Sequence, residues 1–143
     1  SFNQQSQRYV RFSDGVATVK PESVAASEEA SAVFDRAIDA AVEAYGKLLE
    51  AGVPAEDARY LLPNAAETKI VITMNVRELL HFFRLRCCNR AQWEIRDMAH
   101  RMLELARPTA PFIFLDAGAP CVGGACPEGK MTCGNPYPRV TRG

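Results

Sequence analysis

The sequence lacks an excess of charge of either sign, and it lacks any long apolar run. Its 17 Lys and Arg residues balance 17 Asp and Glu residues, which removes the electrostatic reason to expect a nucleic acid or an anionic membrane as a partner. A membrane-spanning helix needs about 20 consecutive apolar residues, and the N-terminus has no basic-then-apolar secretory layout. We therefore expect no membrane association and a cytoplasmic location.

The sequence also lacks an even number of cysteines: it has five, so they cannot all be paired in disulfides within one chain. An odd number is awkward for a disulfide framework but ordinary for free thiols or a metal site. Cys121, Cys126 and Cys133 follow a C-x4-C-x6-C spacing, and Cys87 or Cys88 could supply a fourth zinc ligand. The tight C-x2-C pair of zinc ribbons is absent. We expect free thiols and no metal.

With 143 residues and 48% hydrophobic composition, the chain is long enough for one domain with a real core. It opens on a serine, so we expect a piece of something longer. Residues 1–107 carry the periodic patterns, whereas residues 108–143 are crowded with Cys, Gly and Pro and predict an irregular tail unless something pins it.

The periodic patterns predict a mostly helical α+β fold with one or two short strands. Residues 27–51 have apolar positions at helical spacing behind a capping Ser27. A short helix is expected over residues 54–62, and another helix over residues 91–107. The β-branched stretch at residues 68–74 predicts a strand.

The stretch at residues 74–94 concentrates arginine, amide, imidazole and aromatic groups on what reads as one helix. Asn75 is placed to cap it. Arg86 projects into the apolar arc of this helix, and a buried guanidinium needs an anion or several acceptors nearby. An internal salt bridge, or a helix that breaks at Cys87, explains the pattern equally well. Three side chains fall together on the opposite side: Arg77, His81 and Arg84.

The opening segment S-F-N-Q-Q-S-Q-R-Y is dense in hydroxyl, amide and arginine groups. Such groups donate to phosphates and sugars, although polar surface loops are commoner than ligand loops. The segment also resembles the second half of the signature of flavin-dependent thymidylate synthases. Ser1, Asn3, Ser6, Arg8 and Tyr9 match that signature in order.

The resemblance continues through G-V-P-A-E-D-A-R-Y-L-L-P, N-V-R-E-L-L-H-F-F-R-L-R and R-A-Q-W-E-I, to about residue 106. Several ordered motifs at matching intervals make it a specific signal. The family's upstream R-H-R element is missing here, and Gln4 stands where many members have a glutamate. Residues 1–107 are accordingly identified as part of such a domain.

The resemblance implies a mixed α/β homotetramer that methylates dUMP reductively to dTMP. Methylenetetrahydrofolate would give the carbon, and NADPH would supply a hydride through FAD. We expect this chain alone to be inactive. Two alternatives are a helical assembly or ligand-binding fragment without activity, and a cysteine-based metal-binding module.

The resemblance also implies roles for individual residues. Arg86 would be catalytic, because a guanidinium at the pyrimidine oxygens stabilises the charge that develops as C5 attacks. Ser6 would hydrogen-bond rather than attack, since no histidine in its loop could activate it. The implied dUMP contacts are Gln4, Ser6, Arg8, Arg59 and Arg86. The implied FAD contacts are Asn75, Arg77, His81 and Arg90.

Overall fold

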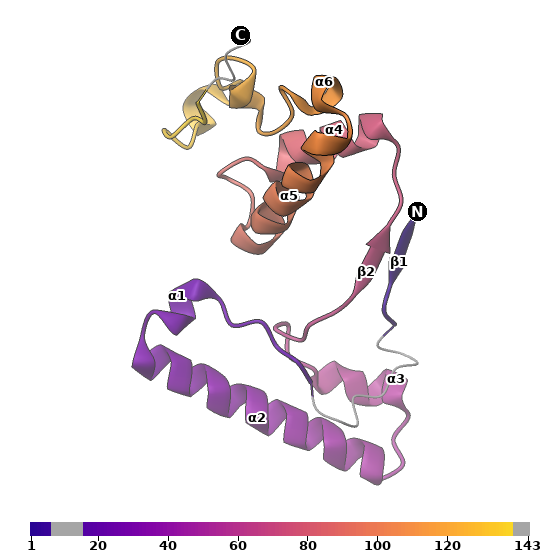
Figure 1. Cartoon of the computed structure of the whole chain (residues 1–143). Coiled ribbons are helices and arrows are strands. Elements are labelled where there is room, and N and C mark those ends of the chain that lie inside the picture. The colour runs from indigo at the N-terminus through magenta and orange to yellow at the C-terminus, as the bar shows by residue number, and fades with distance from the viewer. Residues whose placement is uncertain (7–15, 139–143) are drawn as a thin grey trace. The chain divides into compact units, whose positions relative to one another are not determined.

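Helices form the larger part of the regular structure in the computed structural model of the chain, which describes residues 1–6 and 16–138 (Figure 1). The chain forms two compact units, Ser1–Thr73 and Met74–Gly143. Each unit is described separately below. The predicted mixed helix-and-strand fold is confirmed, whereas the predicted division at residue 107 stays a prediction.

The first unit contains a small antiparallel sheet of two strands, β1 (Phe2–Gln4) and β2 (Ile70–Ile72). Phe2 pairs with Ile72, and Gln4 pairs with Ile70. Thr18 forms a further antiparallel bridge to Ala66. The strand predicted over residues 68–74 is therefore confirmed, in a shorter form.

The helices of the first unit are α1 (Glu22–Ala25), α2 (Glu28–Glu50) and α3 (Ala55–Ala58). Ser27 caps α2 as predicted, since its side chain accepts a hydrogen bond from the Ala30 N–H. A 3-10 turn, Arg59–Leu61, continues α3 and ends before Pro63. Among the described residues of this unit, Tyr45 of α2 and Ala58 of α3 are the buried hydrophobic side chains.

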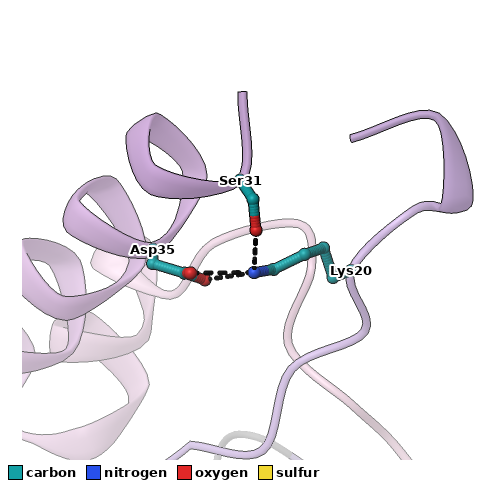
Figure 2. A network of polar contacts seen from close by, with 3 residues as sticks. All are labelled: Lys20, Ser31 and Asp35. Atoms are coloured by element: carbon teal, nitrogen blue, oxygen red, sulfur yellow. Dashed lines mark hydrogen bonds and ion pairs between the residues drawn. The ribbon is translucent and has the colours of Figure 1, made fainter. Parts of the chain in front are cut away.

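A lysine ahead of α1 fastens the incoming chain to α2. Lys20 Nζ donates to Ser31 Oγ at 2.6 Å and to the Asp35 carboxylate at 2.8 Å, along the dashed lines of Figure 2. The same ammonium lies 5.7 Å from the centre of the Phe34 ring, within the range of a cation–π contact. Phe34 and Asp35 lie three and four positions after Ser31, so all three residues share one face of α2 and can contact the same ammonium.

The second unit packs the chain's C-terminal segment against two helices, α4 (Val76–Arg86) and α5 (Trp93–Ala106). The tail carries α6 (Pro111–Phe114) and the 3-10 turns Arg107–Thr109, Pro120–Val122 and Gly129–Met131. Apolar packing is what orders it, because tail side chains complete the core. That core consists of Phe83, Cys87, Ala99, Leu103, Phe114, Ala117, Ala119 and Cys121.

The prediction of one helix through residues 74–94 is wrong beyond Arg86. Cys87 closes α4, and its N–H donates to the Phe83 carbonyl at 2.9 Å. Gln92 then starts α5 by accepting from the N–H groups of Glu94 and Ile95 at 3.0 and 3.1 Å. The alternative of a break at Cys87 is confirmed.

Arg86 is consequently exposed in the last turn of α4, and the expectation of a buried guanidinium is wrong. No ion pair to Arg86 occurs within the described part of the chain.

Across residues 1–6 and 16–138, no helix combines the length and apolarity needed to cross a membrane.

Candidate functional site

A hollow of about 530 Å³ lies at the C-terminal end of α4. Arg84, Arg86 and Arg90 line it together with one carboxylate, Glu128. Guanidinium groups cannot lose their protons at physiological pH, so the charged lining has a positive balance. Such a lining suits an anionic or carbonyl-rich ligand. The remaining lining residues are Leu85, Cys88, Ala91, Pro120 and Pro127.

Arg90 is held at one edge of its guanidinium. Its Nη1 donates to Glu128 Oε2 at 3.0 Å, and the two side chains are 40% and 44% exposed. No second hydrogen bond of Arg90 occurs among the described residues, and neither Arg84 nor Arg86 has a partner there. Several donors therefore stay open for a ligand.

The N-terminal end of α4 presents a second group of donors. Asn75 Oδ1 accepts from the Glu78 N–H at 2.9 Å, which confirms the predicted cap. Its Nδ2 makes no hydrogen bond to the described residues. Arg77 and His81 are exposed and four positions apart, which places them on one face of the helix.

The structure thus divides the four residues implied as flavin contacts. Asn75, Arg77 and His81 lie near the start of α4, whereas Arg90 follows its end. The helix between the two ends is about 16 Å long at 1.5 Å per residue. The structure instead brings Arg90 together with Arg86, the residue implied for the pyrimidine.

Other implied dUMP contacts belong to the first unit. Gln4 is exposed on β1, and Ser6 is exposed just after it. Arg59 opens the 3-10 turn, where its Nε donates to the Glu56 carbonyl at 2.9 Å and leaves the terminal nitrogens for a ligand. Arg8 lies outside the described residues. The dUMP set is therefore split between the two units.

A polar network beside the hollow was missed from the sequence. The Tyr137 hydroxyl donates to Asn89 Oδ1 at 2.7 Å and lies 3.1 Å from His100 Nε2. Asn89 Nδ2 donates to the Asn135 carbonyl at 2.9 Å. Burial raises the pKa of the Tyr137 phenol, with Arg96 acting in the opposite direction. The only signal in the sequence was an aromatic residue flanked by prolines in a polar tail.

All five cysteines are free thiols, and four of them, Cys87, Cys88, Cys121 and Cys126, belong to the core of the second unit or pack against it. Within residues 1–6 and 16–138, no group of three or more His, Cys, Asp or Glu residues is arranged to hold a metal. Burial raises the pKa of Cys87 to about 11, against a smaller opposite effect of Arg107. Cys87 is therefore a protonated packing residue at neutral pH.

A mixed helix-and-strand chain in which three arginines line one hollow has the chemistry expected in the broad class of proteins that bind anionic ligands. Comparison with known families narrows this class, because the family model described as "Thymidylate synthase complementing protein" matches residues 1–112. The chain belongs to this family.

The similar curated proteins are each described as "Flavin-dependent thymidylate synthase". The protein of Geobacter sulfurreducens is 61% identical over 135 residues, covering 94% of this chain and 58% of the relative. The protein of Clostridium tetani is 43% identical over 150 residues, covering 94% of this chain and 60% of the relative. That of Nitratidesulfovibrio vulgaris is 49% identical over 148 residues, covering 96% and 60%.

The chain thus spans about three fifths of the length of these relatives. Its own donor chemistry fits the flavin dependence in their descriptions. The Asn75 amide nitrogen has no hydrogen-bond partner among the described residues, and Arg77 and His81 on the same helix are exposed. Amide, imidazole and guanidinium groups donate to diphosphate and ring carbonyl oxygens, so these residues suit a dinucleotide cofactor.

Proposed function

We propose that the protein containing this chain converts dUMP to dTMP by reductive methylation. Methylenetetrahydrofolate is the carbon donor, FAD is the cofactor and NADPH is the reductant in this proposal. The assembly is a homotetramer in the cytoplasm. Family membership supports the reaction, and one structural observation supports the site: Arg86 and Arg90 line the same hollow.

The shared hollow matters because the reaction needs the pyrimidine and the flavin close together. Arg86 is the proposed pyrimidine contact, and Arg90 is a proposed flavin contact. FAD, when bound, supplies the hydride that the reduction requires. Asn75, Arg77, His81 and Arg90 are proposed to hold it, through the donors that they leave open toward solvent.

Arg86 carries the proposed catalytic role. Uracil C5 is a poor nucleophile, and negative charge builds on the ring carbonyl oxygens as C5 attacks the one-carbon unit. A guanidinium beside these oxygens stabilises that charge without gaining or losing a proton. The absence of an ion-pair partner for Arg86 among the described residues leaves its full charge available for this task.

The remaining contacts position the nucleotide rather than react. Arg8 and Arg59 are proposed to bind the phosphate. The bond from Arg59 Nε to the Glu56 carbonyl fixes the plane of its guanidinium and leaves both terminal nitrogens free of that contact. Gln4 and Ser6 are proposed to hydrogen-bond the nucleotide from β1 and the residues after it.

Tritium release from dUMP labelled at C5 tests the proposed reaction. The full-length protein is purified, its flavin is read from the visible absorption spectrum, and release is followed with and without methylenetetrahydrofolate and NADPH. We expect release that depends on both. A protein that carries no flavin and releases no tritium would contradict the proposal and favour a binding or assembly role.

A further inference from the structure

The tail contacts the loop between α4 and α5 at two separate points. Glu128 pairs with Arg90 at 3.0 Å, and the segment around Asn135 and Tyr137 binds Asn89. Arg90 and Asn89 are adjacent in the chain. Two successive side chains of the loop are therefore held by residues that lie 38 to 48 positions further along.

Asn89 uses both ends of its amide and its backbone. Its Oδ1 accepts from the Tyr137 hydroxyl at 2.7 Å, and its Nδ2 donates to the Asn135 carbonyl at 2.9 Å. Its own carbonyl accepts from Arg96 Nη1 at 3.0 Å. These bonds restrict the backbone and the side chain of the residue directly before Arg90.

Tyr137 is itself well fixed. Its hydroxyl lies 3.1 Å from His100 Nε2, and its N–H donates to Cys121 Sγ at 3.4 Å. Cys121 is buried in the core of the second unit. The contact that restrains Asn89 is thus anchored in the packed interior and not in a free end of the chain.

Glu128 restrains Arg90 without using up its donors. The carboxylate engages one terminal nitrogen, and the guanidinium has five N–H groups in a planar fork. A free arginine loses considerable rotamer entropy when a ligand orders it. An arginine whose plane is already set by one contact loses less of this entropy when it binds a ligand.

We propose that residues 128–137 clamp the loop between α4 and α5, and that Glu128 and Asn89 are positioning residues that hold Arg90 ready for FAD. This inference rests on the proposed function, because it takes Arg90 as a flavin contact. The clamp residues of the tail lie beyond the family match at residues 1–112. Nothing in that match assigns them a role.

A double-mutant cycle in the full-length protein tests the clamp. FAD dissociation constants are measured by flavin fluorescence for Glu128→Gln, Arg90→Ala and the double variant. We expect Glu128→Gln alone to weaken FAD binding about two- to five-fold, the range for a half-exposed ion pair. In the Arg90→Ala background the same change should have no effect, because Glu128 acts through Arg90.

Asp97→Asn is the matched control. Asp97 pairs with Arg101 at 2.8 Å on the exposed face of α5, so the variant also removes a carboxylate from an ion pair of the second unit. It should leave FAD affinity unchanged. Tyr137→Phe keeps the ring but removes the hydroxyl, and should weaken FAD binding about two- to ten-fold through the lost bond to Asn89.

The outcomes separate the clamp from the function on which it rests. If Arg90→Ala weakens FAD binding but Glu128→Gln does not, the clamp is wrong and the flavin role of Arg90 stands. An equal loss from Glu128→Gln in both backgrounds also overturns the clamp, since Glu128 would not act through Arg90. Unchanged FAD affinity in Arg90→Ala overturns the flavin role of Arg90 together with the clamp.

Discussion

Arg86 and Arg90 line one hollow although α4 ends between them at Cys87. In an unbroken helix, residues four apart would stack along one face with a rise of about 6 Å. Here the chain leaves the helix, and a carboxylate from the tail reaches Arg90. One arginine of the hollow is therefore restrained by a carboxylate, while Arg86 has no ion-pair partner among the described residues.

Replacing Arg86 with lysine in the full-length protein should weaken dUMP binding and slow the chemical step while flavin content is retained. Lysine keeps the charge but loses the planar fork, and the loss of a charged hydrogen bond corresponds to about ten- to a hundred-fold. The melting temperature should stay unchanged, because Arg86 is exposed. dUMP binding and thermal unfolding are measured on one preparation.

Arg101→Lys provides the control for that change, because Arg101 is an exposed arginine of the same unit and lies on α5. It should alter neither dUMP affinity nor turnover. A large drop in the melting temperature of Arg86→Lys, with normal dUMP affinity, would instead make Arg86 a structural residue.

The 143-residue chain on its own is expected to release no tritium from labelled dUMP. It spans about three fifths of the length of its curated relatives, and the R-H-R element of the resembled signature is not part of it. The same assay on the full-length protein is the positive control. Release by the isolated chain at the rate of the full-length protein would contradict this expectation.

Zinc should be substoichiometric in the purified protein, and a chelator should leave the melting temperature unchanged. The described residues include all five cysteines but no group arranged to hold a metal. Elemental analysis and thermal unfolding with and without EDTA measure the two quantities. One zinc per chain, lost together with stability on chelation, would establish a structural metal site.

Stability should fall as the pH rises above about 9, because burial raises the pKa of Cys87 from 9.0 to about 11. In that window the unfolded chain releases the thiol proton while the folded chain retains it, so ionisation favours unfolding. Burial raises the pKa of Tyr137 as well, and the sign is the same. Urea unfolding at several pH values measures the slope.

Cys87→Ala should lose stability at neutral pH, since it leaves a cavity in the core, but should show a shallower decline at alkaline pH. A decline as steep as in the unchanged protein would mean that Cys87 does not cause it.

Local signals predicted the secondary structure well where they were strong. Ser27 and Asn75 cap their helices as expected, because a capping side chain needs only backbone groups two or three residues away. The end of α4 was harder to predict. The apolar and basic residues of 74–94 keep a helical period, yet α4 ends with Cys87 as its C-cap and the Gln92 side chain caps the start of α5.

Long-range contacts account for what the sequence did not reveal. The tail reads as irregular, yet Phe114 and Cys121 complete a core with residues of α4 and α5. The pairing of Arg90 with Glu128 joins positions 38 apart, and no local pattern encodes it. The implied ligand contacts came from the resemblance to a family, and the structure adds which of them share a hollow.

The contacts of Lys20 bind together parts of the first unit that are distant in sequence. Its ammonium holds Ser31 and Asp35 of α2, while Val19 donates its N–H to the Ala65 carbonyl at 2.9 Å. Lys20 directly follows Val19, so we expect that opening of the pairing between residues 17–19 and 65–67 also weakens the contacts of Lys20 with the first turns of α2. Deuterium uptake at the Val19 and Glu67 amides would then rise and fall with uptake at the start of that helix, as one cooperatively opening segment.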